Sequence, residues 1–361
     1  MKQSVKHCLP GEGYGDESWF ERLNAFEKQE TRRQVAFKRY HWPELEDGVW
    51  SKRPDYHYPH ILPENNMTKA LFPPVAEEIL LYLDREDIAL HTEALNLRSS
   101  QVCCFNILFP LKKDKDLAKL VLEPLLPQVK DIEDIEFEYT GPRGTTKWLG
   151  EPPEGKRGQN RTSIDAAIWW KDNMDKQCIT LLEWKYTERS FGSCGGYESN
   201  SNVKKKHCWT LDAAGIHPGS KCFLTAGGPQ RSRRYWEHLA EADIDNIKFK
   251  DIKGCPFRGP FYQILRQSLL AEHLRQKLDN INKVEVAVLS FAGNKSLLKC
   301  PPNLKSLIQN TKGNVIDGWN AVTPGAPPVR HIMIEEIMEA ADTFLPQDNA
   351  WRCYVKERYG V

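Results

Sequence analysis

NRTSIDAAIWW (residues 160–170) and CITLLEWKYTE (residues 178–188) are two apolar, β-branched and aromatic stretches separated by the polar segment KDNMDK (residues 171–176). This pattern predicts a β-hairpin. A turn centred near Met174 places Asp165 and Glu183 at equal distances from it, so the two residues face each other across the strands. Because side chains alternate along a strand, Lys185 joins them on one face. The other face then carries Ile164, Ala166, Ile168, Leu182, Trp184 and Tyr186.

The predicted pair of carboxylates suits a hard metal ion. Two carboxylates about 5 Å apart repel each other, and one takes up a proton unless a cation joins them. Mg²⁺ prefers such oxygen ligands and also accepts the phosphate oxygens of a substrate. A lysine beside them can orient or deprotonate a metal-bound water and counter developing phosphate charge. The alternative is a surface hairpin with an ordinary ion pair between an acid and Lys185.

The pairing of Asp165 with Glu183-Trp184-Lys185 resembles the PD-(D/E)xK nuclease superfamily, which has the restriction-endonuclease-like fold. Ile164 stands where that superfamily usually has a proline. With SSQ (residues 99–101) before it and YQ (residues 262–263) after it, the wider pattern is similar to a family of prokaryotic restriction-endonuclease-like proteins, over about residues 91–300. The resemblance implies an α/β core in the order helix, three strands, helix, strand.

The apolar periodicity predicts the same order of elements from the residues alone. Helices are predicted at 18–40, 75–90, 99–109, 116–126, 259–278 and 332–344, with the helix at 99–109 ended by Pro110. Strands are predicted at 132–139 and 284–291 on either side of the hairpin region. On the strand at 132–139, Glu136 and Glu138 are expected to face solvent.

Composition sets the broad class of the protein. The 361 residues are 40% hydrophobic and 27% charged, with a net charge of +1. Bulk basicity therefore gives no argument for nucleic-acid binding, which would need local patches. No run approaches about 18 apolar residues, and the first ten residues lack the apolar region of a signal peptide, so we expect a cytoplasmic protein without a membrane partner. We expect an N-terminal helical and loop region (1–90), a nuclease core (91–300) with an insertion at about 190–255, and a C-terminal extension (301–361) packed on the core.

Further candidates for the site come from the resemblance and from local charge. In the superfamily, the first helix often carries an extra acidic metal ligand, for which Glu93 is the candidate, and the later helix lends a polar residue, for which Gln263 is the best match. Glu93 is equally compatible with a capping or solvent-facing role. The two densest basic clusters are candidates for phosphate contact, although such runs are otherwise solvated. These clusters are Lys204, Lys205 and Lys206, and Arg231, Arg233 and Arg234.

The insertion also contains Cys194, Cys208, Cys222 and Cys255, which suggests zinc or an iron–sulfur cluster. The spacing lacks the CxxC pair that is typical of closed tetrahedral sites, and scattered buried thiols are the simpler alternative.

These observations predict a metal-dependent endonuclease that acts on DNA, with Asp165 and Glu183 as ligands of Mg²⁺, or of Mn²⁺ in its place, and Lys185 beside them. A homodimer would suit double-strand cleavage, because one site cuts one strand. The resemblance further implies restriction or another form of genome defence. Two alternatives remain: a nucleic-acid-binding module of the same fold without catalysis, and a structural protein built on a metal bound by the four cysteines.

Overall fold

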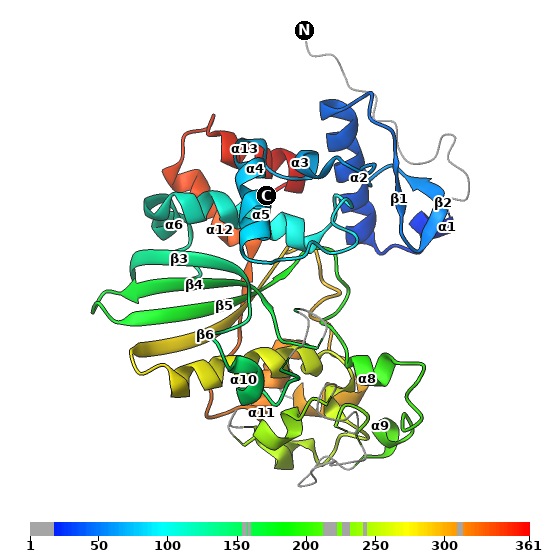
Figure 1. Ribbon diagram of the computed structural model, residues 1–361, viewed down its shortest axis with the longest axis vertical. Coiled ribbons are helices and arrows are strands. Elements are labelled where there is room, and N and C mark those ends of the chain that lie inside the picture. The colour runs from blue at the N-terminus through cyan, green and yellow to red at the C-terminus, as the bar shows by residue number, and fades with distance from the viewer. Residues whose placement is uncertain are drawn as a thin grey trace.

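The computed structural model describes residues 18–153, 157, 160–211, 222–225, 232–240, 244–308 and 313–361. A five-stranded sheet with the order β3-β4-β5-β6-β7 forms its centre (Figure 1). The strands are β3 (Val129–Tyr139), β4 (Ile164–Asp172), β5 (Gln177–Lys185), β6 (Ile281–Ser290) and β7 (Arg330–Met333). The first three are antiparallel neighbours, whereas β5, β6 and β7 run parallel to one another. The chain crosses from β5 to its parallel neighbour β6 through a long connection that includes a helix, as parallel pairing requires.

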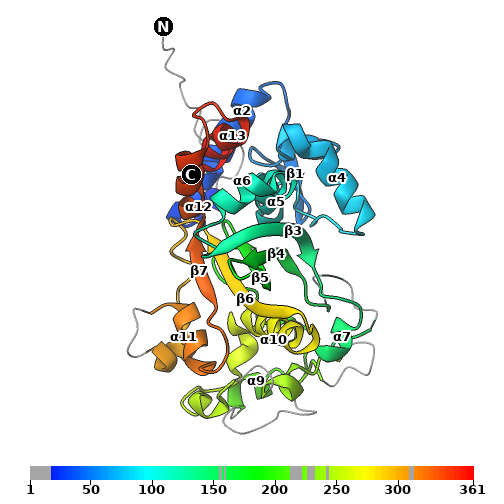
Figure 2. The same ribbon diagram turned by 90° about the vertical axis from the view of Figure 1, so that its left-hand side faces the viewer.

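Helices cover both faces of this sheet (Figures 1 and 2). The face that we call the α5 face carries α2 (Ala25–His41), α4 (Ala76–Arg85), α5 (Ser100–Lys113), α6 (Lys115–Val121), α12 (Ile334–Phe344) and α13 (Ala350–Tyr359). The α10 face carries α10 (Phe261–Lys277) and α11 (Val315–Val322). The short helices are α1 (Ser18–Glu21), α3 (Met67–Ala70), α7 (Thr145–Trp148), α8 (Gly195–Glu198) and α9 (His207–Thr210), and β1 (Gly48–Trp50) pairs with β2 (Arg53–Tyr58) in a separate sheet.

Each face of the central sheet buries its own hydrophobic cluster. Ala166, Leu182 and Trp184 belong to the cluster under α5, while Ile179 and Leu181 belong to the one under α10. The alternation of side chains along β5 therefore produces the two layers that the sequence pattern predicts. The order α5, β3, β4, β5, α10, β6 also confirms the predicted order of elements.

The hairpin has the predicted register. Ala166 pairs with Leu182 and Lys171 with Gln177, so the turn is centred on residue 174. The Asp172 side chain closes the turn by accepting hydrogen bonds from the backbone N–H groups of Met174 and Lys176, both at 2.9 Å. Short polar side chains at turns commonly bond the backbone in this way.

Four helix predictions were wrong in detail: the helices predicted at 75–90 and 116–126 end early, at Arg85 and Val121. The helix predicted at 18–40 is broken into α1 and α2, because Asn24 and Glu27 form a capping box that starts a new helix. The helix predicted to end at Pro110 continues to Lys113. Proline lacks the N–H that would bond the carbonyl of Asn106. That carbonyl instead accepts a hydrogen bond from the indole N–H of Trp351 on α13, at 3.2 Å.

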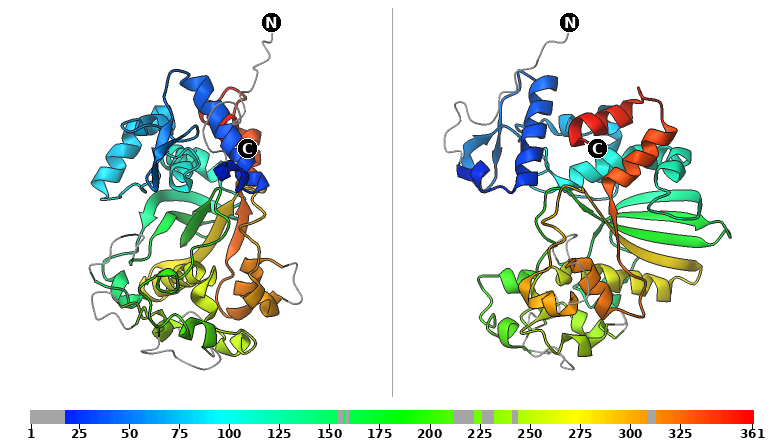
Figure 3. Two further views of the ribbon diagram at one scale, coloured as in Figure 1. Left: turned by 90° about the vertical axis from the view of Figure 1, so that its right-hand side faces the viewer. Right: turned by 180° about the vertical axis from the view of Figure 1, so that it is seen from behind.

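The C-terminal residues are part of the same core. β7 extends the sheet, and Trp351, Val355 and Tyr359 of α13 belong to the cluster under α5. Helices α2 and α13 lie side by side (Figure 3), and the Gln34 side chain donates to the carbonyl of Arg358 at 2.8 Å. Helices α2 and α13, which are far apart in the sequence, thus cover the α5 face together.

Among the helices of the described residues, none is both long enough and apolar enough to cross a membrane.

Candidate active site

Asp165, Glu183 and Lys185 converge where β4 begins and β5 ends. Continuing the pairing of Ala166 with Leu182 by one residue places Asp165 opposite Glu183. An Asp165 carboxylate oxygen accepts the backbone N–H of Trp184 at 2.6 Å, which ties the two strands together. The Nζ of Lys185 lies 2.6 Å from Oε1 of Glu183. The structure therefore brings together the three side chains that the hairpin geometry selected.

Helix α10 fixes the position of Glu183. Gln263 donates from Nε2 to Oε1 of Glu183 at 2.5 Å, and Gln267 donates to the other carboxylate oxygen. Gln263 also accepts the backbone N–H of Gly192 at 2.6 Å. Gln263 is therefore at the site, as the resemblance implied. Gln267 was not selected from the sequence, although its spacing of four residues from Gln263 places both on one helix face.

A third acid, Glu138 on β3, lies beside this pair. Phe137 pairs with Ala166 and Tyr139 with Ile164, so Glu138 stands across from Asp165. Its carboxylate accepts hydrogen bonds from Gln101 on α5 at 2.8 Å and from Ser163 at 2.6 Å. The prediction that Glu138 faces solvent was wrong, because its side chain is buried.

The backbone at Glu138 explains this error. Its φ of 48° is left-handed, a conformation that residues other than glycine adopt only rarely. Phe137 and Tyr139 consequently fall in opposite hydrophobic clusters, although plain alternation would place them on one face. Ile164 and Ala166 are divided in the same way, so the prediction that Ile164 shares a face with Ala166 was also wrong. Such irregularities in strands are common beside functional sites.

The electrostatics of the site favour the binding of a cation. Burial raises the pKa of Asp165 well above its ordinary range, and repulsion from Glu183 and Glu138 adds to the effect, while Lys185 opposes it. Burial also raises the pKa of Glu183, against the attraction of Lys185. A positive charge placed between Asp165 and Glu183 would relieve this repulsion.

Lys185 provides part of that positive charge. Burial alone would lower the pKa of Lys185, but the attraction of Glu183, Glu188 and Asp165 outweighs burial and raises it. The side chain is therefore a protonated ammonium group. It can donate hydrogen bonds and balance negative charge, whereas taking a proton from water would first require it to lose its own.

The donor set fits Mg²⁺ rather than a metal that the protein encloses completely. In the parts of the chain that the structure describes, no three His, Cys, Asp or Glu side chains are grouped so that they could hold a metal ion by themselves. Mg²⁺ is typically held by one or two carboxylates, with water and substrate phosphate oxygens completing its shell. Asp165 and Glu183 are such a pair of hard oxygen donors.

The structure places Glu93 away from this group. Glu93 lies in the turn before α5, not on the helix, and it accepts a hydrogen bond from the Ser51 hydroxyl at 2.5 Å. The acid from outside the hairpin that faces Asp165 is Glu138, on the first strand of the sheet. Nothing in the sequence pattern indicated that Glu138, and not Glu93, would lie beside Asp165.

The predicted basic clusters belong to the insertion. Lys204, Lys205 and Lys206 precede α9, and the Nζ of Lys205 lies 5.0 Å from the centre of the Tyr197 ring. Arg233 is half-buried and Arg234 is exposed, whereas Arg231 lies outside the described residues. Contact of these clusters with phosphate stays a prediction.

The four cysteines of the insertion have free thiols. The backbone N–H of Cys255 donates to the carbonyl of Cys208 at 2.9 Å, and burial followed by repulsion from the neighbouring thiols raises the pKa of Cys255. The cysteines therefore lie in one region, but they are not among any metal-holding group of the described residues. The geometry gives no support to a metal site built on them.

The chain was compared with known proteins and protein families. Residues 19–360 match a protein family described as "Restriction Endonuclease associating with ARP". No curated protein and no solved structure matches the chain. The matched range runs from α1 to the last helix, so it includes the N-terminal and C-terminal elements as well as the sheet.

Proposed function

The chain belongs to the family of restriction endonucleases associating with ARP, and from this membership and the geometry of the site we propose that it is a metal-dependent endonuclease that hydrolyses phosphodiester bonds in DNA. Its α/β architecture is that of a restriction-endonuclease-like protein. The single observation that supports the activity most is the convergence of Asp165, Glu183 and Lys185 at the edge of the hairpin. Restriction of foreign DNA is the biological role that the family favours.

Asp165 and Glu183 would hold the Mg²⁺ ion, with Mn²⁺ as a substitute. A bound Mg²⁺ supplies Lewis acidity toward the phosphoryl oxygen and lowers the pKa of a water molecule. The protein contributes the rigid placement of the two carboxylates. The N–H of Trp184 fixes Asp165, and Gln263 and Gln267 fix Glu183, so neither side chain needs to reorganise when the substrate arrives.

Lys185 would stabilise the negative charge that develops on the phosphate. Its ammonium group is already aligned by Glu183 at 2.6 Å, and Oε1 of Glu188 lies 4.0 Å from it. Electrostatic donors that are held in advance contribute strongly because no reorganisation is needed during the reaction. A nucleic-acid-binding module without catalysis would not need these three side chains to converge, so the geometry favours the enzyme.

Cleavage of supercoiled plasmid by purified protein tests the proposal. We expect nicking or linearisation with Mg²⁺ or Mn²⁺ and none with EDTA. Asp165→Asn and Lys185→Met should each reduce the rate at least about 100-fold, the usual effect of removing an electrostatic group from an active site. Asp175→Asn is the matched control, because it makes the same chemical change at the exposed turn of the same hairpin. Divalent-dependent cleavage that survives in Asp165→Asn would refute the proposal.

A further inference from the structure

A cavity of about 550 Å³ lies among the N-terminal elements, bounded by α1, the β1–β2 sheet, the loop before α5 and the segment after β5. Pockets for small ligands typically enclose about 300–1,000 Å³. Arg189, which lines this cavity, follows Lys185 by four residues. The cavity is thus built partly on the segment that leaves the candidate active site.

Aromatic rings form much of its lining. The ring centre of Trp19 lies 5.2 Å from those of Tyr58 and His60, and the Trp50 ring lies 6.3 Å from that of Tyr58. Trp19 and Trp50 are only half-buried, so part of each indole is accessible. Indole rings suit a planar ligand, because nucleic-acid bases stack on aromatic side chains whatever their sequence.

The charge of the lining is positive. Arg22, Lys52, Arg53, Arg98 and Arg189 line the cavity together with neutral residues, and no Asp or Glu is among the lining residues. Oε2 of Glu27, which is not a lining residue, lies 2.6 Å from Nη2 of Arg189. Within the described residues, Arg22, Lys52 and Arg53 form no ion pair. Positive charge that the described residues do not balance favours an anionic ligand.

Two buried donors in the lining have no acceptor. His60 is 2% exposed, and its Nε2 lies 3.2 Å from Nη2 of Arg98. A guanidinium group can only donate, so Nε2 accepts and the neutral imidazole carries its proton on Nδ1. Both Nδ1 of His60 and Nε of Arg98 are buried without a hydrogen-bond partner. Both atoms lie behind the accessible surface of the cavity wall, so the groups that can meet a ligand are the exposed parts of the aromatic and basic lining side chains.

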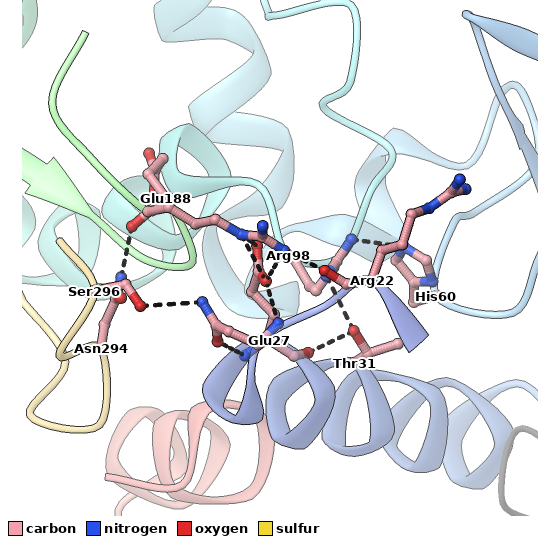
Figure 4. A network of polar contacts seen from close by, with 10 residues as sticks. Arg22, Glu27, Thr31, His60, Arg98, Glu188, Asn294 and Ser296 are labelled. Atoms are coloured by element: carbon pink, nitrogen blue, oxygen red, sulfur yellow. Dashed lines mark hydrogen bonds and ion pairs between the residues drawn. The ribbon is translucent and has the colours of Figure 1, made fainter. Parts of the chain in front are cut away.

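The cavity wall is held in place by a polar network (Figure 4). Arg98 donates to the Thr31 hydroxyl on α2 at 3.0 Å as well as contacting His60. Asn294 donates to the carbonyls of Tyr186 and Glu188, both at 2.9 Å, which fixes the segment between Lys185 and Arg189. The segment that joins the candidate active site to Arg189 of the cavity is therefore held by hydrogen bonds.

We propose that this cavity binds a single nucleotide, with the base against Trp19 and Trp50 and its phosphate on Arg22, Lys52 and Arg53. In the setting of the proposed function, on which this step rests, the nucleotide belongs to the DNA substrate and is unpaired or turned out of the helix. Extruding a base requires unstacking, which is least costly for a mismatched or unpaired nucleotide. The cavity would thereby select the strand position that is presented to Asp165 and Glu183.

Binding is measured with the Asp165→Asn protein in EDTA, so the result does not depend on cleavage. The probes are a labelled DNA duplex with one unpaired nucleotide, the same duplex fully paired, and the free mononucleotides AMP, GMP, CMP and TMP as competitors. We expect the duplex with the unpaired nucleotide to bind about 10-fold more tightly than the paired one, and Trp19→Ala or Lys52→Ala to remove that preference. Trp19→Phe should retain most of it, since a ring remains. Tyr40→Ala, which removes an exposed aromatic ring outside the cavity, is the matched control.

Each outcome has one meaning for the cavity. A preference for the unpaired duplex that is lost in Trp19→Ala but kept in Tyr40→Ala supports a nucleotide of the DNA as ligand. Competition by a free mononucleotide, with the same sensitivity to Trp19→Ala, supports a free nucleotide. Equal binding of both duplexes together with no competition overturns the proposal, even if the plasmid is cleaved. If the plasmid is not cleaved but binding shows the expected pattern, only the nuclease proposal fails.

Discussion

The negatively charged form of Asp165 is disfavoured in the folded chain. Burial, and then repulsion from Glu183 and Glu138, raises its pKa well above the ordinary range. The folded protein therefore keeps a proton at pH values where the unfolded chain has lost it. This contribution to stability is present at low pH and is lost as the pH rises from about 4 through the raised pKa. Functional sites commonly hold such unfavourable charge because a ligand relieves it.

Replacing this one carboxylate should therefore stabilise the protein. At about pH 8 we expect Asp165→Asn to melt at a higher temperature than wild type, by an amount equivalent to about 1 kcal/mol, with the difference shrinking toward pH 4. Asparagine can still accept the Trp184 N–H, so the local hydrogen bond is kept. Adding Mg²⁺ should raise the melting temperature of wild type and leave that of the variant almost unchanged. Thermal melts across this pH range, with and without Mg²⁺, measure both effects. A variant less stable than wild type at pH 8 would contradict the expected repulsion.

At the same scale, the burial of Glu138 could not be predicted from the sequence pattern of its strand. Alternating polar and apolar residues on β3 predicted its strand correctly but assigned Glu138 to solvent. The φ of 48° at Glu138 accompanies hydrogen bonds of its carboxylate with Gln101 and Ser163, which come from elsewhere in the chain. The closeness of Asp165, Glu183 and Lys185 was predictable, because it depends only on the register of one hairpin.

At the scale of elements, α10 holds the carboxylate of Glu183 in position. Gln263 and Gln267 stand one helical turn apart and donate to the two oxygens of the same Glu183 carboxylate. Gln267 is buried, and its own Oε1 atom has no partner, so it is held there for its donor alone. The apolar periodicity of this segment predicted the helix, whereas the target of its polar residues depends on how it packs across β5 and β6.

Gln267→Leu tests whether α10 holds Glu183 in position. Leucine has a similar shape but cannot donate, so one buried oxygen of Glu183 loses its partner, and we expect a loss of about 1–3 kcal/mol in stability. Cleavage should fall as well, because Glu183 is then free to turn away from Asp165. The control is Gln276→Leu, an exposed glutamine on the same helix that bonds Glu272. Urea unfolding and the plasmid assay report the two effects. If both variants behave alike, Gln267 has no special role.

At the scale of the whole molecule, α2 and α13 come from opposite parts of the sequence and together cover the α5 face of the core. Tyr186, one residue beyond β5, donates to Glu30 on α2 at 2.7 Å and accepts from Gln34 at 2.9 Å. α13 packs against α2 and α5. The sequence predicted the sheet and most helices from local pattern, but it assigned the C-terminal residues to an extension on the core. The β7 strand pairs with residues of β6 that precede it by 43 positions, and α13 contacts α2 and α5 from more than two hundred residues away, so no local pattern encodes these contacts.

The contact between Trp351 and Asn106 is the clearest case, and a double-mutant cycle measures it. Trp351 gives the Asn106 carbonyl the hydrogen bond that Pro110 cannot supply. Trp351→Phe keeps an aromatic ring but removes the donor, so we expect it to destabilise the wild-type background by about 1–3 kcal/mol. Pro110→Ala restores a backbone N–H four residues after Asn106, and in that background the same substitution should cost clearly less. Urea unfolding of the four proteins gives the coupling directly. Strict additivity would mean that the indole serves α5 only as packing volume, and that α5 tolerates its proline without help from the C-terminal helix.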